Sequence, residues 1–106
     1  MQFVVHALDQ IDAGPRRAAA IAAHRDYLST APEQHEVTVL LSGPLVSDDE
    51  QQMIGSFFLL DAPDRGAVDA LFADDPLRCA NVWSDYTVTT VRIRQNNMTS
   101  TQGMSE

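Results

Sequence analysis

The stretch Gly55-Ser56-Phe57-Phe58-Leu59-Leu60 decides the fold, because this run without a charged residue forms the centre of a predicted strand over residues 52–61. Pro63 then opens a predicted helix over residues 64–73. Before the strand, residues 36–42 alternate and predict another strand, and a polar, acidic connection joins the two. The centre of the chain is therefore expected to be a hairpin followed by a helix.

The two ends of the chain complete this pattern. Residues 2–9 are rich in β-branched and aromatic types and predict the first strand. An alanine-rich helix is predicted over residues 15–30, since a proline suits the first helical turn, and we expect it to stop before Pro32. After a short helical turn reaching Ala80, the last strand is predicted over residues 82–94.

The order β-α-β-β-α-β is the split βαβ pattern of ferredoxin-like α+β domains. We expect one domain over residues 1–94, with an antiparallel four-stranded sheet and both helices on one face. The other face would carry apolar residues such as Phe57 or Phe58, and a second copy packed sheet to sheet is the simplest cover. We therefore expect a homodimer. Residues 95–106 hold few apolar side chains and predict a disordered tail.

The charge balance excludes some partners. The 106 residues include fifteen acidic and seven basic side chains, every basic one an arginine, and the formal net charge is −8. Arg16 with Arg17 and Arg92 with Arg94 are the only close cationic pairs, and each is interpreted as a solvated surface pair. Nucleic-acid binding needs a cluster of cations, so we expect no nucleic-acid partner.

Location and redox state are also constrained. No apolar run approaches the length of a membrane-spanning helix, and the first residues are strand-like and show no signal-peptide pattern. We expect a cytoplasmic protein with no membrane partner. Cys79 is the single cysteine, which excludes an intramolecular disulfide, and we interpret it as a small buried thiol.

The first predicted helix carries a histidine on its inward face. Five of its residues recur at spacings of three and four and so share one face: Ala20, Ile21, His24, Leu28 and Ala31. A histidine there is either a core residue satisfied by a backbone carbonyl or a group that serves a cleft. The pattern alone leaves both interpretations open.

Four short motifs follow one another in order along the chain. They are Ala23-His24-Arg25-Asp26-Tyr27-Leu28, Leu41-Ser42-Gly43-Pro44-Leu45, Gly55-Ser56-Phe57-Phe58 and Phe72-Ala73-Asp74-Asp75-Pro76-Leu77. In this order and spacing the sequence resembles the YciI-like (YCII-related) family over roughly residues 1–94. The resemblance implies a dimeric α+β barrel, related in architecture to muconolactone isomerases and to small cofactor-free monooxygenases.

The resemblance also implies site residues. Members of the family typically show a His and an Asp beside a cleft, and the motifs carry these over to His24 and Asp75 as catalytic residues. Ser42-Gly43-Pro44 matches the family's strand-end motif near the same cleft and is assigned to substrate binding. Asp74 is the alternative partner for His24. No cofactor is implied.

Such a pair makes chemical sense, and each member also has a structural interpretation. Imidazole titrates near neutrality, and a carboxylate fixes its tautomer and raises its basicity. On the residues alone, Asp75 before a proline is equally a cap for a helical turn, and Ser42-Gly43-Pro44 is equally a strand terminator. No G-x-S-x-G elbow surrounds Ser42, which argues against an activated serine nucleophile.

The remaining candidates are weaker. A metal site needs three or four converging ligands, and His6 on a strand and His35 in a loop have no matched partners, so we expect no metal. Trp83, Tyr86 and Phe58 either line a cleft for a flat substrate or form the core of a dimer.

Two classes of function remain, with a third behind them. The first is a cofactor-free lyase or isomerase, dehydrochlorinase-like or muconolactone-isomerase-like, that acts on a small aromatic or enol-type metabolite with His24 as base and Asp75 orienting it. One branch of the family eliminates chloride from a chlorinated hydroxyquinol. The second is a non-catalytic small-molecule-binding or accessory protein, and the third is a cofactor-free monooxygenase. The sequence does not separate the first two, because a dyad shows where protons can move without identifying the substrate.

Overall fold

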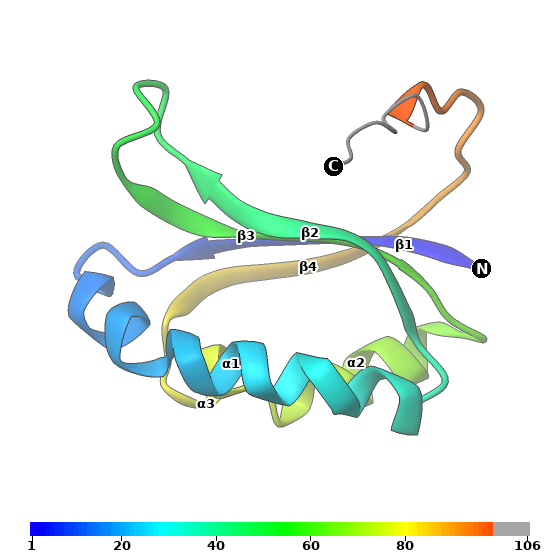
Figure 1. Cartoon of the computed structure of the whole chain (residues 1–106), viewed down its shortest axis with the longest axis horizontal. Helices are drawn as coiled ribbons and strands as arrows, with labels where there is room; N and C mark the ends of the chain where they lie inside the picture. The colour runs from blue at the N-terminus through cyan, green and yellow to red at the C-terminus, as the bar shows by residue number, and fades with distance from the viewer. Residues whose placement is uncertain (99–106) are drawn as a thin grey trace.

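A computed structural model describes residues 1–98 of the chain, which form a four-stranded antiparallel sheet with its helices on one face (Figure 1). The strand order is β2-β3-β1-β4, as in ferredoxin-like domains, and the expected α+β class is confirmed. The elements are β1 (Gln2–Asp9), α1 (Gly14–Gln34), β2 (Thr38–Val46), β3 (Met53–Asp61), α2 (Arg65–Ala73), α3 (Pro76–Cys79) and β4 (Trp83–Val91).

The central strand β1 pairs with β3 on one side and β4 on the other, and its alternation decides which side chains meet the helices. Phe3, Val5 and Ala7 are fully buried toward the helices, while the residues between them point to the opposite face. Gly55 lies beside β1, where an added Cβ would clash with the carbonyl oxygen of Ala7. This position therefore accepts only glycine without a shift of the backbone.

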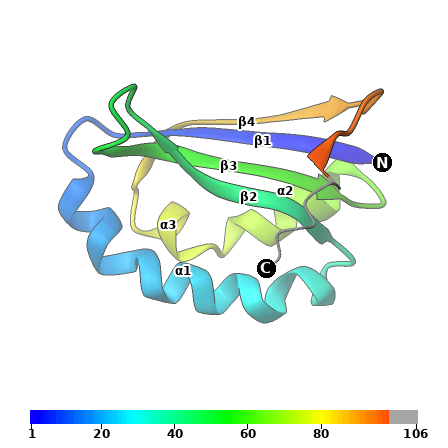
Figure 2. The ribbon, with the colours of Figure 1, turned by 45° about the horizontal axis from the view of Figure 1, so that its top comes forward.

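The hydrophobic core lies between the sheet and the helical layer (Figure 2). Helix α2 buries Val68, Leu71 and Phe72 against the sheet, and the single turn of α3 adds Leu77. Helix α1 spans the layer and contributes partly buried side chains along the predicted stripe. The residues at the centre of this core are Phe3, Val5, Phe58, Leu60, Val68, Leu71, Phe72 and Leu77.

Helix α1 is longer than predicted, because it continues through Pro32 to Gln34. A proline this close to the end of a helix removes only one backbone hydrogen bond, and the Pro32 ring is buried, which offsets that loss. The carbonyl of Pro32 also accepts the N–H groups of His35 and Val37 at 3.0 and 2.9 Å, and these bonds close the helix end. The prediction that the helix stops before Pro32 was wrong.

Strand β2 also passes its predicted end, since Ser42-Gly43-Pro44 lies within the strand and does not terminate it. Proline is tolerated there because β2 is an edge strand, so the missing N–H is not needed by a further neighbour. Strand β4 is shorter than predicted. Its last pair joins Val91 to Gln2 at the start of β1, so residues 92–94 have no further strand residue to pair with.

Within residues 1–98, one face of the sheet carries no helix (Figure 1). Phe58 points into the core, so Phe57 is the member of that pair on the open face, where it lies opposite His6 of β1. Exposed Leu8 and Leu41 lie on the same face by register. This arrangement motivates the expected homodimer, which stays a prediction.

The predicted disordered tail, residues 95–106, falls mainly on residues 99–106, which lie outside the described residues. Residues 95–98 are exposed and follow the end of β4. Within residues 1–98, no helix combines the length and apolar character that crossing a membrane requires.

Candidate active site

The structure brings His24 of α1 and Asp75 into direct contact. The Nδ1 atom of His24 lies 2.9 Å from both carboxylate oxygens of Asp75, although 51 residues separate the two in the sequence. His24 is 8% exposed and Asp75 is fully buried. Asp74, the alternative partner, is exposed and ends α2, so the contact is made by Asp75.

Asp75 combines both predicted interpretations. It is the N-cap of α3, and its Oδ1 atom accepts the backbone N–H of Leu77 at 2.8 Å. The following proline has no N–H to satisfy, so the short helix can start directly after the carboxylate. The cap fixes the orientation of the side chain, and both oxygens still contact the imidazole. Capping and pairing with His24 are therefore served by one carboxylate.

The pairing determines which nitrogen of His24 is free. A carboxylate accepts hydrogen bonds, so the network assigns the proton of the neutral ring to Nδ1 and leaves Nε2 with a lone pair. Nε2 makes no hydrogen bond within residues 1–98, and it is not among the polar atoms sealed from solvent without a partner. Because His24 lines a cavity, Nε2 is accessible from that cavity.

The cavity has a volume of about 310 Å³ and lies between α1 and the strands β2 and β3. Ser42-Gly43-Pro44 lines it, as do Ser56 and Phe58 of β3 and, from α1, Arg17 and His24. All three residues assigned from sequence to substrate binding thus border the cavity that His24 borders. An added Cβ at Gly43 would meet no atom within 4 Å, so nothing inside the described chain requires glycine at this position.

Of the aromatic residues considered for a cleft, one lines the cavity and the others do not. Phe58 borders the cavity, whereas Trp83 is a core residue that stacks on Tyr86 with ring centroids 6.0 Å apart. Burial, reinforced by the carboxylate of Asp69, raises the pKa of Tyr86 to about 12. Burial also raises the pKa of Tyr27, with smaller contributions from Asp74 and Asp75, and its hydroxyl donates to the carbonyl of Leu71 at 2.6 Å.

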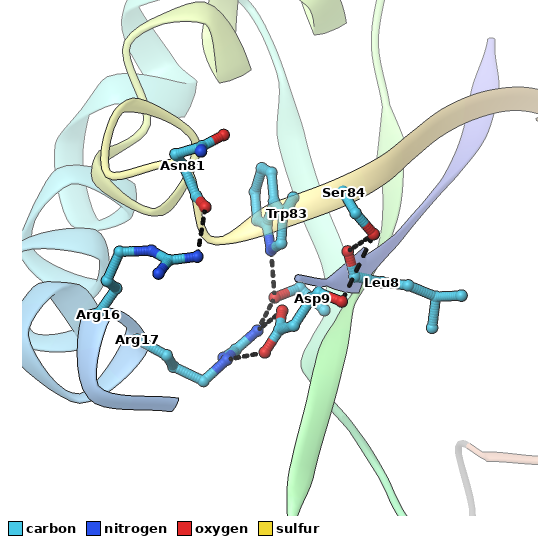
Figure 3. A network of polar contacts seen from close by, with 8 residues as sticks. Leu8, Asp9, Arg16, Arg17, Asn81, Trp83 and Ser84 are labelled. Carbon is cyan, nitrogen blue, oxygen red and sulfur yellow. Dashed lines mark hydrogen bonds and ion pairs between the residues drawn. The ribbon is translucent and has the colours of Figure 1, made fainter. Parts of the chain in front are cut away.

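Arg17 and Asp9 form a second buried pair (Figure 3), which was not predicted from the sequence, and Arg17 borders the cavity. Arg17 donates from Nε and Nη2 to the two carboxylate oxygens of Asp9, at 2.7 and 2.9 Å, and from Nη2 to Ser56 Oγ at 2.8 Å. The indole N–H of Trp83 donates to the same hydroxyl at 3.1 Å. The interpretation of Arg17 as a solvated surface residue was wrong, since it is 6% exposed.

A signal for Arg17 was present in the sequence. It lies seven residues, or two turns, before His24, so it extends the inward stripe of α1 toward the N-terminus. Asp9, the last residue of β1, supplies the carboxylate that makes its burial possible. Arginine is rarely buried without such a partner, and the partner is eight residues away on another element.

The remaining candidates do not join the site. His6 is exposed on the sheet and His35 caps the end of α1, and residues 1–98 contain no group of three or more His, Cys, Asp or Glu side chains placed to hold a metal ion. Cys79 is exposed, so its interpretation as a buried thiol was wrong. The single turn of α3 points Leu77 inward, and Cys79, two residues later, faces outward.

Comparisons with known proteins agree with this architecture. A 5-chloro-2-hydroxyhydroquinone dehydrochlorinase from Burkholderia phenoliruptrix AC1100, solved in complex with 2,5-dihydroxybenzoquinone, has a similar fold, with a TM-score of 0.75 and 23% sequence identity over 87% of this chain and 94% of that chain. No curated protein gave a significant sequence match. The sequence model of the YCII-related domain matches residues 1–92, and the chain therefore belongs to the YCII-related family.

Proposed function

We propose that this chain is a cofactor-free lyase or isomerase that moves a proton on a small aromatic or enol-type metabolite. One observation carries the proposal: the Nδ1 side of His24 is held by a fully buried carboxylate, while its Nε2 atom is accessible from a cavity. Such an arrangement suits a general base, because the carboxylate fixes the orientation and the tautomer of the ring.

The chemistry follows from the two sides of the ring. Nε2 takes a proton from a carbon or hydroxyl next to a carbonyl, and the electron pair left behind moves toward the carbonyl oxygen. Asp75 stabilises the imidazolium that forms. The reaction is an isomerisation if the proton returns at another atom. It is an elimination if the electron pair instead expels a leaving group such as chloride.

The size of the cavity and the similar structure support a substrate of this kind. A cavity of about 310 Å³ is at the lower end of the range that small-molecule sites occupy, and suits one ring with a few substituents. The dehydrochlorinase of similar fold is named for a substituted hydroquinone, a flat, enol-type ring whose keto tautomer carries a proton next to a carbonyl. Chloride elimination from such a ring is therefore the first reaction to examine.

The test starts with a thermal-shift screen of aromatic catabolites that includes 5-chloro-2-hydroxyhydroquinone and 2,5-dihydroxybenzoquinone. For the compound that the wild type converts, His24→Asn is expected to lower kcat by about 10²- to 10⁴-fold, the usual contribution of a general base. His35→Asn is the matched control, because it removes a histidine that does not border the cavity.

The outcomes separate the proposal from its alternative. Unchanged turnover in a folded His24→Asn variant would refute the assignment of the base. Compounds that raise the melting temperature but are never converted would favour a non-catalytic binding protein with the same cavity.

A second copy of the chain is our proposed partner for the open face of the sheet. The face presents Leu8, Leu41 and Phe57 without a covering helix, and large apolar patches on soluble domains are commonly covered. Light scattering at micromolar concentration is expected to give about twice the chain mass of 11.6 kDa. A monomer at that concentration would contradict the proposal.

A further inference from the structure

The charges around the cavity differ in sign from those of the chain as a whole. The sequence holds fifteen acidic residues and seven arginines, yet the charged or titratable side chains that line the cavity within the described residues are Arg17, Arg25 and His24. No Asp or Glu of residues 1–98 lines it. Asp75 contacts His24 and Asp9 contacts Arg17, but neither carboxylate lines the cavity. The cavity is therefore lined by the imidazole and the guanidinium of these pairs.

Arg17, which lines this cavity and a neighbouring one, has an unused donor. Its Nε and Nη2 atoms bond Asp9 and Ser56, which fixes the plane of the guanidinium. The third nitrogen, Nη1, makes no hydrogen bond within residues 1–98 and is not among the sealed polar atoms without a partner. The side chain is buried except where it borders these two cavities, so Nη1 is open to a molecule bound in one of them.

Ser56 presents a second donor. Its oxygen already accepts hydrogen bonds from Arg17 Nη2 at 2.8 Å and from the indole of Trp83 at 3.1 Å. With both acceptor positions occupied, the hydroxyl proton is left to donate, and within the described residues it has no acceptor. Ser56 is 3% exposed and borders the cavity, so this orphan donor also requires a partner there.

We propose that the cavity recognises an anionic oxygen of its ligand, a carboxylate or a ring enolate or phenolate, through Arg17 Nη1 and Ser56 Oγ, with Arg25 at the exposed rim. This inference rests on the proposed function and deepens it by naming the substrate class. Two orphan donors beside a base are suited to hold the oxygen on which negative charge collects when His24 removes a proton. Arg17 is paired with Asp9, so it acts through a directed N–H and less through net charge.

The test compares flat, single-ring aromatic probes that differ in charge. Calorimetry or NMR titration at pH 8 would measure Kd for benzoate and 4-nitrophenolate, with benzamide as the neutral control. The wild type is expected to bind at least one of the two anions at least tenfold more tightly than benzamide. A preference for benzoate identifies a carboxylate ligand, and a preference for 4-nitrophenolate identifies an enolate or phenolate.

The variants assign the contacts. Arg17→Lys keeps the charge beside Asp9 but removes the extra N–H, and we expect it to weaken anion binding about tenfold or more. Arg25→Gln, at an exposed position where folding is not at risk, is expected to weaken it about threefold. Arg92→Gln removes the same charge from an exposed position on the other end of the sheet and should leave Kd unchanged.

The results distinguish this inference from the proposed function. It is wrong if neither anion binds the wild type at millimolar concentration, if benzamide binds as tightly as the anions, or if both Arg17→Lys and Arg25→Gln leave Kd unchanged. His24→Asn is expected to retain anion binding within a fewfold while losing turnover. Loss of turnover without any anion preference would overturn only the inference, and anion binding with full turnover in His24→Asn would overturn only the assigned base.

Discussion

Two buried carboxylates each hold a basic side chain that lines the cavity, and the two basic side chains differ in their acid–base chemistry. Asp75 holds His24, and Asp9 holds Arg17, with contacts of 2.7 to 2.9 Å in both pairs. Imidazole exchanges its proton near neutral pH, whereas a guanidinium stays charged throughout. The first pair can therefore transfer a proton, and the second can only donate hydrogen bonds. The same arrangement, a buried carboxylate bound to a basic side chain, therefore suits the base that we propose in one place and the anion-binding donor that we propose in the other.

One helix supplies both partners. Arg17 and His24 lie two turns apart on the inward face of α1, while their carboxylates come from the end of β1 and the start of α3. Both side chains on α1 thus depend on carboxylates from other elements. Because the two pairs use carboxylates from different elements, we expect that the Arg17–Asp9 pair and the His24–Asp75 pair can each be disrupted without disrupting the other.

The largest expected effect is the loss of stability when the arginine loses its carboxylate. Asp9→Asn leaves the Arg17 guanidinium buried beside a neutral amide, and breaking a buried ion pair in this way costs about 3–5 kcal/mol. Urea unfolding would measure it. Asp12→Asn is the matched control, because the Asp12 side chain is 87% exposed and its pair with Arg16 is long, at 3.7 Å.

A double replacement tests whether the pair is needed for folding at all. Asp9→Leu with Arg17→Met removes both charges, and such replacements of buried ion pairs are often neutral or stabilising. We expect the double variant to recover most of the stability lost by Asp9→Asn and to lose the anion preference of the cavity. Equal destabilisation of the single and double variants would show that packing, and not the ion pair, holds this corner.

The two pairs also differ in how far the sequence reveals them. His24 was predicted because it lies in the middle of an apolar stripe and in a family motif. Asp75 was predicted as a site residue through the family motif alone, since its position before a proline indicated only a helix cap. Arg17 lies on the same stripe, but at its end and next to another arginine, so its charge suggested solvent. Only the approach of β1 to α1 brings Asp9 within reach, and that contact is tertiary.

The fold itself was largely predictable, because hydrophobic periodicity and turn residues are local signals. Two of the three errors in element bounds concern prolines whose context is not local. Pro32 stays helical because its ring is buried near the helix end, and Pro44 stays in a strand because β2 has no neighbour on one side. Neither burial nor edge position can be read from the residues beside these prolines.

An intermediate effect is expected for the second pair. Asp75→Asn keeps a good N-cap for α3 but replaces the charged acceptor of His24 Nδ1–H, so we expect a loss of about 1–3 kcal/mol in unfolding free energy. Turnover should fall less than in His24→Asn, because the imidazole remains but its tautomer is less well fixed. Asp64→Asn is the control, since Asp64 caps α2 from an exposed position and contacts no histidine among the described residues.

The smallest effect is expected for the Tyr86 hydroxyl, a buried polar group that, unlike the two pairs, has no hydrogen-bond partner within the described residues. The Tyr86 hydroxyl is buried and makes no hydrogen bond by geometry within the described residues, while the guanidinium of Arg78 stacks on its ring at 4.3 Å. Replacing an unpartnered hydroxyl removes little, so Tyr86→Phe is expected to change stability at pH 7 by less than about 1 kcal/mol.

The same variant should differ from the wild type at high pH. Burial raises the pKa of Tyr86 from 10.0 to about 12, so the folded state holds this proton more tightly than the unfolded state. The stabilising contribution is complete below pH 10 and is lost progressively as the pH rises toward 12. Wild-type melting temperature should therefore fall more steeply than that of Tyr86→Phe over this interval, while Tyr27, whose pKa is also raised, contributes equally to both. Parallel curves from pH 8 to pH 12 would show that the Tyr86 hydroxyl is solvated in the folded protein, unlike the two carboxylates beside the cavity.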